Sequence, residues 1–228
     1  MTGIAQEPAP DPRRIEHFAA NVAHDFNNLL TGILGNLELM QSRAKRSGET
    51  HFDGYLEGAR NAGGRAATFA QRLLAYSGRA AQDAEPVRLA AIILEIVEPM
   101  REHGLRVAVA ELDAAAQVHC DPADLELALH ELLNNAVDAT AERGEINLSL
   151  RQLGAEVQIT VADSGVGMAP DILARAVEPF FTTRPNGAGK GLGLPIVDRF
   201  ARQTGGALQL ASLPDQGTTV QLILPKYE

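Results

Sequence analysis

A histidine, a carboxylate and two amides follow one another closely in the stretch from Asn21 to Leu30. At about 100° per residue in a helix, His24 lies roughly 200° from Val22 and points away from the apolar stripe of this segment. A histidine on the polar face of an amphipathic helix has no packing role, so we interpret His24 as a reactive group. The stripe recurs at spacings of three and four and consists of Ile15, Phe18, Val22, Phe26, Leu29, Ile33, Leu37 and Met40.

A carboxylate and an amide lie one helical turn apart in the second half of the chain, at Glu131 and Asn135. Residues four apart share one face of a helix, so their oxygen atoms can act together. Such hard oxygen ligands suit Mg²⁺ that carries phosphate groups. Taken alone, an acid and an amide at this spacing indicate an ordinary solvated helix face, so the pair gains meaning only from the other motifs.

Asp163 comes at the end of a predicted strand and is followed by Gly165 and Gly167. Glycines at such a place let the backbone approach a flat ligand closely, and the carboxylate can accept a hydrogen bond from an exocyclic amine. A tight turn explains this stretch, taken alone, equally well. Phe180 and Phe181 stand in a later loop, where at least one of them also fits a local core position.

A glycine-rich stretch over 187–195 runs into another predicted helix. Free amides and the positive end of a helix dipole bind phosphate at such a place, and Lys190 adds a positive charge. The stretch is not the phosphate loop Gly-x-x-x-x-Gly-Lys-Ser/Thr, because Gly191 follows the lysine. One glycine-rich loop is weak evidence, but four such stretches in this order indicate a common nucleotide site.

Two long amphipathic helices are expected before these motifs, over about 13–45 and 52–77, with a short polar turn between them. One helical hairpin cannot bury both apolar stripes, whereas two hairpins related by a two-fold axis form a four-helix bundle. We therefore expect a homodimer. Gly63 and Gly64 weaken the second helix by roughly 1 kcal/mol each, which indicates either a bend or a close packing contact.

Strands and helices alternate in the rest of the chain. We expect helices over 89–101, 122–142 and 194–204, and strands over 106–112, 145–153, 156–162, 207–212 and 218–224. Asp121 is the expected N-cap of the helix that begins at residue 122. Helices grouped on one face of a mixed, mainly antiparallel sheet form an α/β-sandwich of the α+β class. The predicted organisation is a flexible leader over 1–12, a helical hairpin over 13–78, a linker over 79–86 and the sandwich domain over 87–228.

The composition argues against several other functions. The formal net charge of −9 argues against nucleic-acid binding, because a phosphate backbone repels an acidic surface. No apolar run reaches the ~18 residues that span a bilayer, so we expect no membrane insertion. Cys120 is the single cysteine, which excludes an intramolecular disulfide and the multi-cysteine zinc sites and fits a reducing, cytoplasmic setting.

The order and content of these motifs resemble the catalytic core of the bacterial sensor histidine kinases, whose ATP-binding fold is shared with gyrase, Hsp90 and MutL-type ATPases. The hairpin resembles their dimerisation and phosphoacceptor domain, and His24-Asp25-Phe26-Asn27-Asn28 resembles the phosphorylation motif of one subgroup. The likeness extends from about residue 13 to the C-terminus. It implies a two-component kinase that transfers the γ-phosphoryl group of ATP to His24, and then to an aspartate on the receiver domain of a response regulator.

The resemblance also implies roles for individual residues. His24 matches the phosphoacceptor, Asp25 the acid that takes up the imidazole proton, and Asn28 the polar position linked to phosphatase chemistry. Glu131 matches a catalytic position and, with Asn135, holds Mg²⁺. The other implied nucleotide-binding positions are Asp138, Asp163, Gly165, Gly167, Phe180, Phe181, Gly189, Lys190, Gly191, Leu192, Gly193 and Thr218.

Three features depart from the common pattern of that family. Asn28-Leu29 replaces a proline that often follows the histidine, Glu131 stands where many members have asparagine, and Lys190 stands where threonine is frequent. None of these removes a required group. His17, on nearly the same helical face as His24, is an alternative acceptor. Two other functions stay open, namely a phosphotransfer adaptor with a decayed nucleotide site and an ATPase or serine kinase of the same superfold.

Overall fold

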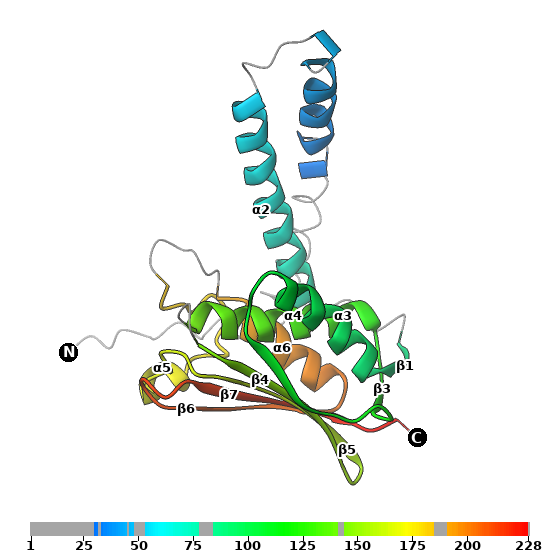
Figure 1. Cartoon of the computed structure of the whole chain (residues 1–228), viewed down its shortest axis with the longest axis vertical. Coiled ribbons are helices and arrows are strands. Elements are labelled where there is room, and N and C mark those ends of the chain that lie inside the picture. The colour runs from blue at the N-terminus through cyan, green and yellow to red at the C-terminus, as the bar shows by residue number, and fades with distance from the viewer. Residues whose placement is uncertain are drawn as a thin grey trace, which may run out of the picture. The chain divides into compact units, whose positions relative to one another are not determined.

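The computed structural model describes residues 30–31, 33–44, 46–47, 53–77, 84–140, 144–184 and 191–227. The chain divides into two compact units, Met1–Arg79 and Ala80–Glu228 (Figure 1). The predicted fold class is confirmed, because a helical N-terminal region precedes an α/β domain with a mixed, mainly antiparallel sheet. In the part of the chain that is described, no helix is long and apolar enough to cross a membrane.

The first unit contains a helix over 30–31, 33–44 and 46–47, which lies beside α2 (Asp53–Ser77) (Figure 1). The guanidinium of Arg60 donates a hydrogen bond to the side-chain oxygen of Gln41 over 2.5 Å. A Cβ added at Gly63 would lie 2.7 Å from the Cδ2 atom of Leu34, whereas one at Gly64 would meet nothing within 4 Å. Of the two explanations for the glycine pair, a close helix contact therefore applies at Gly63.

Part of the predicted apolar stripe is exposed in the single chain. The side chains of Ile33 and Met40 are 51% and 58% exposed. They are seven residues apart, so they lie on nearly the same face of the helix. Two large apolar side chains on one helix face form a surface that another apolar surface can cover.

The second unit is built on a five-stranded sheet with the strand order β2-β4-β5-β7-β6. Only β2 and β4 pair in parallel; the other neighbours are antiparallel. A separate two-stranded sheet joins β1 and β3. The strands are β1 (Glu85–Arg88), β2 (Val107–Leu112), β3 (Gln117–Cys120), β4 (Ile146–Leu153), β5 (Glu156–Asp163), β6 (Ala207–Ser212) and β7 (Thr218–Pro225).

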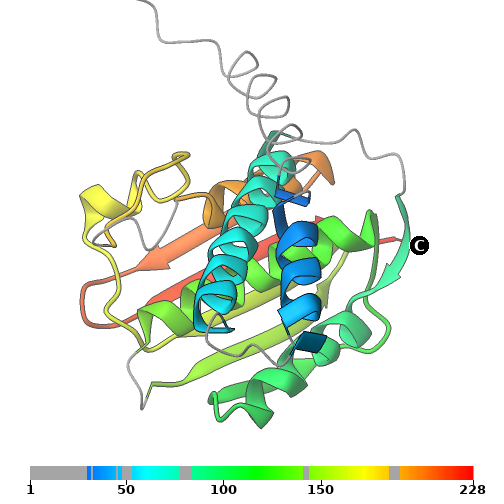
Figure 2. The same ribbon diagram turned by 90° about the horizontal axis from the view of Figure 1, so that it is seen from above.

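Three helices cover one face of this sheet, and their bounds are α3 (Leu89–Glu102), α4 (Pro122–Ala139) and α6 (Gly193–Gln203) (Figure 2). Alternation along β5 explains the arrangement: Val157, Ile159 and Val161 are buried, while the residues between them are only partly buried. Successive side chains of a strand point to opposite faces, so the buried set packs against the helices. A short helix, α5 (Pro170–Leu173), lies outside this layer.

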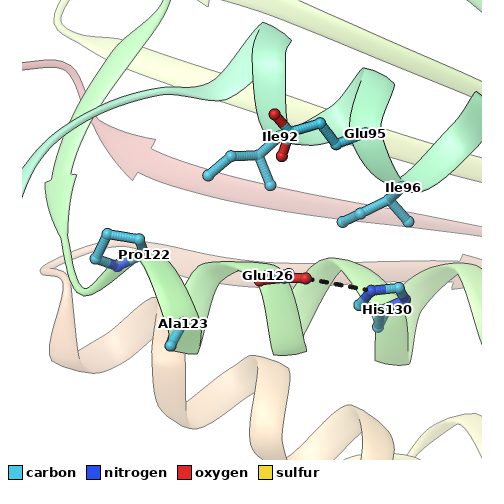
Figure 3. A pocket seen from close by; sticks show the side chains of 7 residues that line it. All are labelled: Ile92, Glu95, Ile96, Pro122, Ala123, Glu126 and His130. Carbon is cyan, nitrogen blue, oxygen red and sulfur yellow. Dashed lines mark ion pairs between the residues drawn. The ribbon is translucent and has the colours of Figure 1, made fainter.

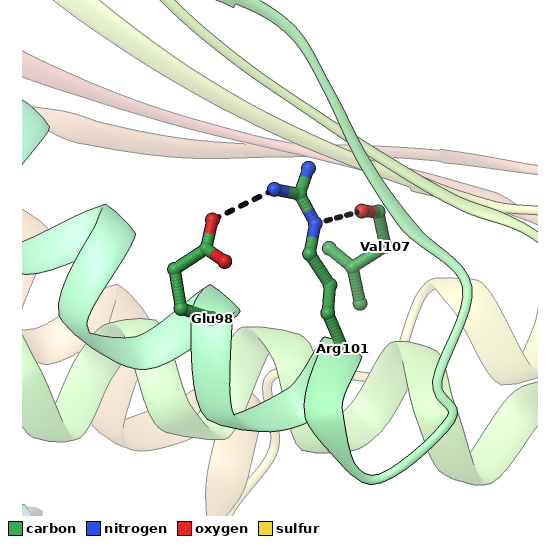
Figure 4. A network of polar contacts seen from close by, with 3 residues as sticks. All are labelled: Glu98, Arg101 and Val107. Atoms are coloured by element: carbon green, nitrogen blue, oxygen red, sulfur yellow. Dashed lines mark hydrogen bonds and ion pairs between the residues drawn. The ribbon is translucent and has the colours of Figure 1, made fainter.

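The connection from α3 to β2 is held by one arginine. Nε of Arg101 donates to the backbone carbonyl of Val107 over 2.7 Å, and its Nη1 atom pairs with the carboxylate of Glu98 at 2.8 Å (Figure 4). Because the two residues of the ion pair are three apart on α3, the guanidinium is oriented toward the start of β2. The helix end and the first strand of the large sheet are therefore tied together.

The structure differs from the predicted elements in three places. Strands β1 and β3 and helix α5 were not predicted. The two strands have only four residues each, which is too short for a clear alternation of apolar and polar side chains. Glu85 and Pro86, expected in the linker, belong to β1. Helix α4 ends at Ala139 instead of residue 142, because Thr140 is extended and its amide bonds to the carbonyl of Val137.

The predicted N-cap of α4 is confirmed: a side-chain oxygen of Asp121 accepts a hydrogen bond from the amide of Ala123 over 2.9 Å. We expect Asp121→Ala to lower the free energy of unfolding by about 1 kcal/mol, because a helix amide loses its partner. Asp121→Asn keeps a capping oxygen and serves as the matched control with a much smaller effect. Urea denaturation of both variants checks this, and an equal loss in the two would contradict a capping role.

Candidate functional site

Asp163 ends β5, and its carboxylate is fixed by backbone amides. The Oδ1 atom accepts hydrogen bonds from Gly165 over 2.8 Å and from Thr218 over 3.3 Å. Burial raises the pKa of the Asp163 carboxyl above its usual value, and the two amide hydrogen bonds partly oppose this shift. A partly buried carboxylate of this kind favours a further donor, which an exocyclic amine supplies.

Two glycines let the loop after β5 and the turn before β7 lock together. Gly167 has φ +62° and Gly217 has φ +82°, a backbone conformation that favours glycine. A Cβ at Gly167 would clash with the carbonyl of Leu213, and a Cβ at Gly217 would clash with the carbonyl of Asp163. The loop that contains the predicted position Gly167 therefore meets the turn that leads into the predicted position Thr218, although about fifty residues of sequence separate them.

Ser212, which the sequence analysis did not identify, joins these two segments. Its hydroxyl accepts a hydrogen bond from the amide of Met168 over 2.8 Å and contacts the carbonyl of Gly217 and the hydroxyl of Thr218, both at 2.9 Å. In the sheet register, Thr218 lies opposite both Asp163 and Ser212. The three residues form one row across β5, β7 and β6, and a serine at the end of a strand carries no sequence signal for such a role.

Glu131 and Asn135 of α4 lie beside the first residue of α6. A Cβ added at Gly193 would be 2.9 Å from Oε2 of Glu131 and 3.0 Å and 3.4 Å from the side-chain nitrogen and oxygen of Asn135. Glu131 is only 4% exposed. The missing side chain at Gly193 leaves room for the acid and the amide at the N-terminus of α6, and their oxygens match the donor set that Mg²⁺ prefers.

The two predicted phenylalanines stand at the start of a loop whose far end is Gly191. The amide of Phe180 donates to the carbonyl of Gly191 over 2.8 Å, and a Cβ at Gly191 would lie 2.5 Å from the carbonyl carbon of Phe180. Phe180 is 50% exposed, so it is not a core residue. Phe181 is half-buried, with the guanidinium of Arg175 4.1 Å from its ring centroid. The backbone at Phe180 thus lies directly against the backbone at Gly191.

Asp138, on the last turn of α4, forms an ion pair with Arg184 in the loop that follows the two phenylalanines. Sequence reasoning identified the aspartate but missed the arginine. Leu192 is 1% exposed, so its backbone is the part of that residue that can face a ligand. Gly189 and Lys190 lie outside the described residues.

His24, Asp25 and Asn28, together with the alternative acceptor His17, also lie outside the described residues. Among the residues that are described, no group of three or more His, Cys, Asp or Glu side chains could hold a metal ion. A metal at Glu131 and Asn135 would therefore take its other ligands from phosphate oxygens and water, as Mg²⁺ commonly does.

A cavity of about 380 Å³ lies elsewhere, between α3 and α4 (Figure 3). Glu126 and His130 line it from α4, with 3.8 Å between a carboxylate oxygen and Nε2 of the imidazole. Ile92, Glu95 and Ile96 face them from α3. Glu131 and Asn135 are on another face of α4 and do not line it, so this cavity is not the predicted nucleotide site.

Two family models match the chain. The one described as "His Kinase A (phospho-acceptor) domain" matches residues 14–81, and the one described as "Histidine kinase-, DNA gyrase B-, and HSP90-like ATPase" matches residues 120–228. The first match contains His24, and the second contains each predicted nucleotide-binding residue.

Relatives and a solved structure extend the likeness over nearly the whole chain. The sensor kinase CckA of Brucella abortus (strain 2308) is 31% identical over an alignment that covers 93% of this chain and 24% of CckA. The sensor histidine kinase ZraS of Escherichia coli (strain K12) is 31% identical over 221 residues, which cover 92% of this chain and 45% of ZraS. The crystal structure of full-length ShkA in complex with AMPPNP has a TM-score of 0.76 at 27% identity and covers 92% of this chain and 46% of that one.

The chain thus spans less than half the length of these two curated relatives. Within that span, however, the phosphoacceptor match precedes the ATPase match, and the two together cover most of the chain. The relatives that align over more than nine-tenths of the chain are themselves named as sensor kinases. The chain belongs to the histidine kinase family.

Proposed function

We propose that this chain binds ATP in its second unit, transfers the γ-phosphoryl group to His24 and passes it on to an aspartate of a response regulator. The observation that carries the proposal is the grouping of acceptors and helix amides at one end of the sheet. Asp163 and Thr218 lie in one row, and Glu131 and Asn135 flank the start of α6. ShkA, which shares this fold, was crystallised with the ATP analogue AMPPNP.

Each end of this arrangement suits one end of ATP. The Asp163 carboxylate would accept a hydrogen bond from the exocyclic amine of the adenine. The N-terminus of α6 would place free amides and a positive dipole end at the phosphates, and Lys190 would add charge. Glu131 and Asn135 would hold Mg²⁺, which when bound neutralises charge on the phosphates.

The transfer itself needs little covalent work from the protein. A nitrogen of the His24 imidazole attacks the γ-phosphorus, an N–P bond forms, the bond from phosphorus to the oxygen of ADP breaks, and the imidazole proton passes to Asp25. The neutral form of an imidazole is the form that acts as a nucleophile. Glu131, next to the phosphates, would act at the catalytic centre, and Asn28 would orient water when the phosphorylated regulator is hydrolysed.

A homodimer of hairpins belongs to the same proposal. Ile33 and Met40 are both more than half exposed on nearly one face of the first helix. Pairing with a second hairpin would remove these side chains from water, at roughly 25 cal/mol per Å² of apolar surface. The match of the phosphoacceptor-domain model over 14–81 supports this assembly.

Phosphate incorporation tests the central claim. We expect the wild-type chain to take up label from γ-labelled ATP with Mg²⁺, and His24→Ala to take up none, because the nucleophile is removed. His17→Ala is the matched control and should keep incorporation near the wild-type level. The bound phosphate should be labile in acid and stable in alkali. An acid-stable product in the wild type, or label retained in His24→Ala, would instead favour a serine kinase or another acceptor.

The variant Asp163→Asn should change stability and nucleotide binding in opposite directions. Burial raises the pKa of this carboxyl in the folded protein. The free energy of unfolding therefore falls as the pH rises from the pKa of the unfolded chain through the pKa of the folded one. Asparagine keeps the oxygen that accepts from Gly165 and Thr218 but carries no charge. We therefore expect Asp163→Asn to have a higher free energy of unfolding than the wild type at pH 7, and this difference should shrink toward pH 4. We also expect the variant to bind ATP at least tenfold more weakly.

Denaturation at both pH values and a nucleotide titration check the Asp163 prediction. Asp171→Asn on exposed α5 is the control, and it should alter neither quantity. A variant less stable than wild type at pH 7, or one that binds ATP as tightly, would contradict the assigned role.

The assembly prediction concerns Ile33 and Met40. We expect the wild type to sediment as a dimer at micromolar concentration, and the double variant Ile33→Glu/Met40→Glu to sediment as a monomer, because four buried charges per dimer are too costly. Leu39→Glu changes an exposed leucine about 100° away from Met40 on the helix and should stay dimeric. A wild-type monomer in analytical ultracentrifugation would rule out the proposed dimer.

A further inference from the structure

The hydroxyl of Ser212 has three partners, and their chemistry fixes where its proton lies. A serine hydroxyl has one proton to donate and two lone pairs to accept with. The amide of Met168 can only donate, so it uses one lone pair of Ser212 over 2.8 Å. The carbonyl of Gly217 can only accept, so the Ser212 proton points to it over 2.9 Å.

The third contact is then determined. Ser212 and Thr218 have their hydroxyl oxygens 2.9 Å apart, and either could be the donor by geometry alone. Since the Ser212 proton is already used, Thr218 must donate to Ser212. The opposite assignment would leave the Ser212 oxygen facing the Gly217 carbonyl oxygen at 2.9 Å with no proton between them, which is repulsive. All three contacts are satisfied in one arrangement only.

This arrangement leaves the Thr218 hydroxyl with lone pairs but no proton for a ligand. Its cross-strand neighbour Asp163, when ionised, also only accepts. Both residues are in register with the buried positions of β5 and β7, on the side of the sheet that the helices cover. The row from Ser212 through Thr218 to Asp163 thus presents acceptors to whatever base lies there.

We propose that Ser212 is a positioning residue that makes the nucleotide site prefer an amino-purine over an oxo-purine, by holding the Thr218 hydroxyl as an acceptor. The inference rests on the proposed function, since it deepens the description of the same site. Adenine carries an amine where guanine carries a carbonyl oxygen. Two fixed acceptors pair with the amine and repel the carbonyl, and an unpaired buried polar group is costly.

Nucleotide titrations of the full 228-residue chain with ATP and with GTP test this proposal. In Ser212→Ala the Thr218 proton loses its acceptor and becomes free to turn toward a ligand. We expect the ratio of ATP affinity to GTP affinity to fall roughly fivefold, as for the loss of one oriented hydrogen bond. A purely structural role would weaken both nucleotides equally and leave the ratio unchanged, which would overturn the proposal. Ser149→Ala, in the middle of β4, is the control for a serine-to-alanine change in a strand and should keep the ratio.

A double-mutant cycle shows whether Ser212 acts through Thr218. In a Thr218→Val background no hydroxyl remains to be oriented, so adding Ser212→Ala should leave the ATP to GTP ratio unaltered. If the ratio still fell in that background, Ser212 would act by another route and the proposal would be wrong.

Neutron diffraction of the deuterated protein without nucleotide provides a readout independent of binding. A deuteron on Thr218 directed at Ser212, together with one on Ser212 directed at Gly217, is the expected result. A Thr218 deuteron directed elsewhere would overturn the assignment. Should the wild type bind neither nucleotide, the proposed function fails together with the preference for amino-purines, whereas the neutron result still decides the hydroxyl orientation separately.

Discussion

The need of one partly buried carboxylate for hydrogen-bond donors constrains the functional end of the sheet. Removing a charge from water is costly unless donors replace the water, and Asp163 obtains them from the amides of Gly165 and Thr218. These amides are available only because the chain turns sharply after β5 and enters β7 at the right register. The loop after β5 and the turn before β7 interlock at Gly167 and Gly217. A single acceptor thus ties together two segments that are far apart in the sequence.

Helix α4 performs three tasks because its faces differ. Leu129 and Leu133 are fully buried and hold the helix in the core. Glu131 and Asn135, which are offset from these leucines by about half a turn, lie beside the start of α6. Glu126 and His130 face α3 across a cavity. A helix fixed by its apolar face holds its polar groups in place at little entropic cost, which is what the proposed phosphate site would require.

Local patterns predicted much of this arrangement, and the parts that depend on register were missed. The predicted helices correspond to α2, α3, α4 and α6, and the predicted strands correspond to β2, β4, β5, β6 and β7. Sequence reasoning missed Ser212 and Arg184, because their partners Met168 and Asp138 lie 44 and 46 residues away along the chain. Such contacts arise only after β6 pairs with β7 and the loop folds back on α4. No spacing rule within one segment contains that information.

Charge balance bears on how Glu131 and the triphosphate of the proposed function could share one helix end. Glu131 is 4% exposed with Oε2 next to the position of Gly193, so its charge already faces the N-terminus of α6. A helix N-terminus is equivalent to about half a positive charge, which is far less than the charge of the phosphates of ATP. In the proposed function, a divalent cation would lie between the phosphates and Glu131, with the Asn135 oxygen as a neutral ligand. An asparagine at position 131 would bring no negative charge, so under the proposed function glutamate there should make nucleotide binding depend more strongly on Mg²⁺.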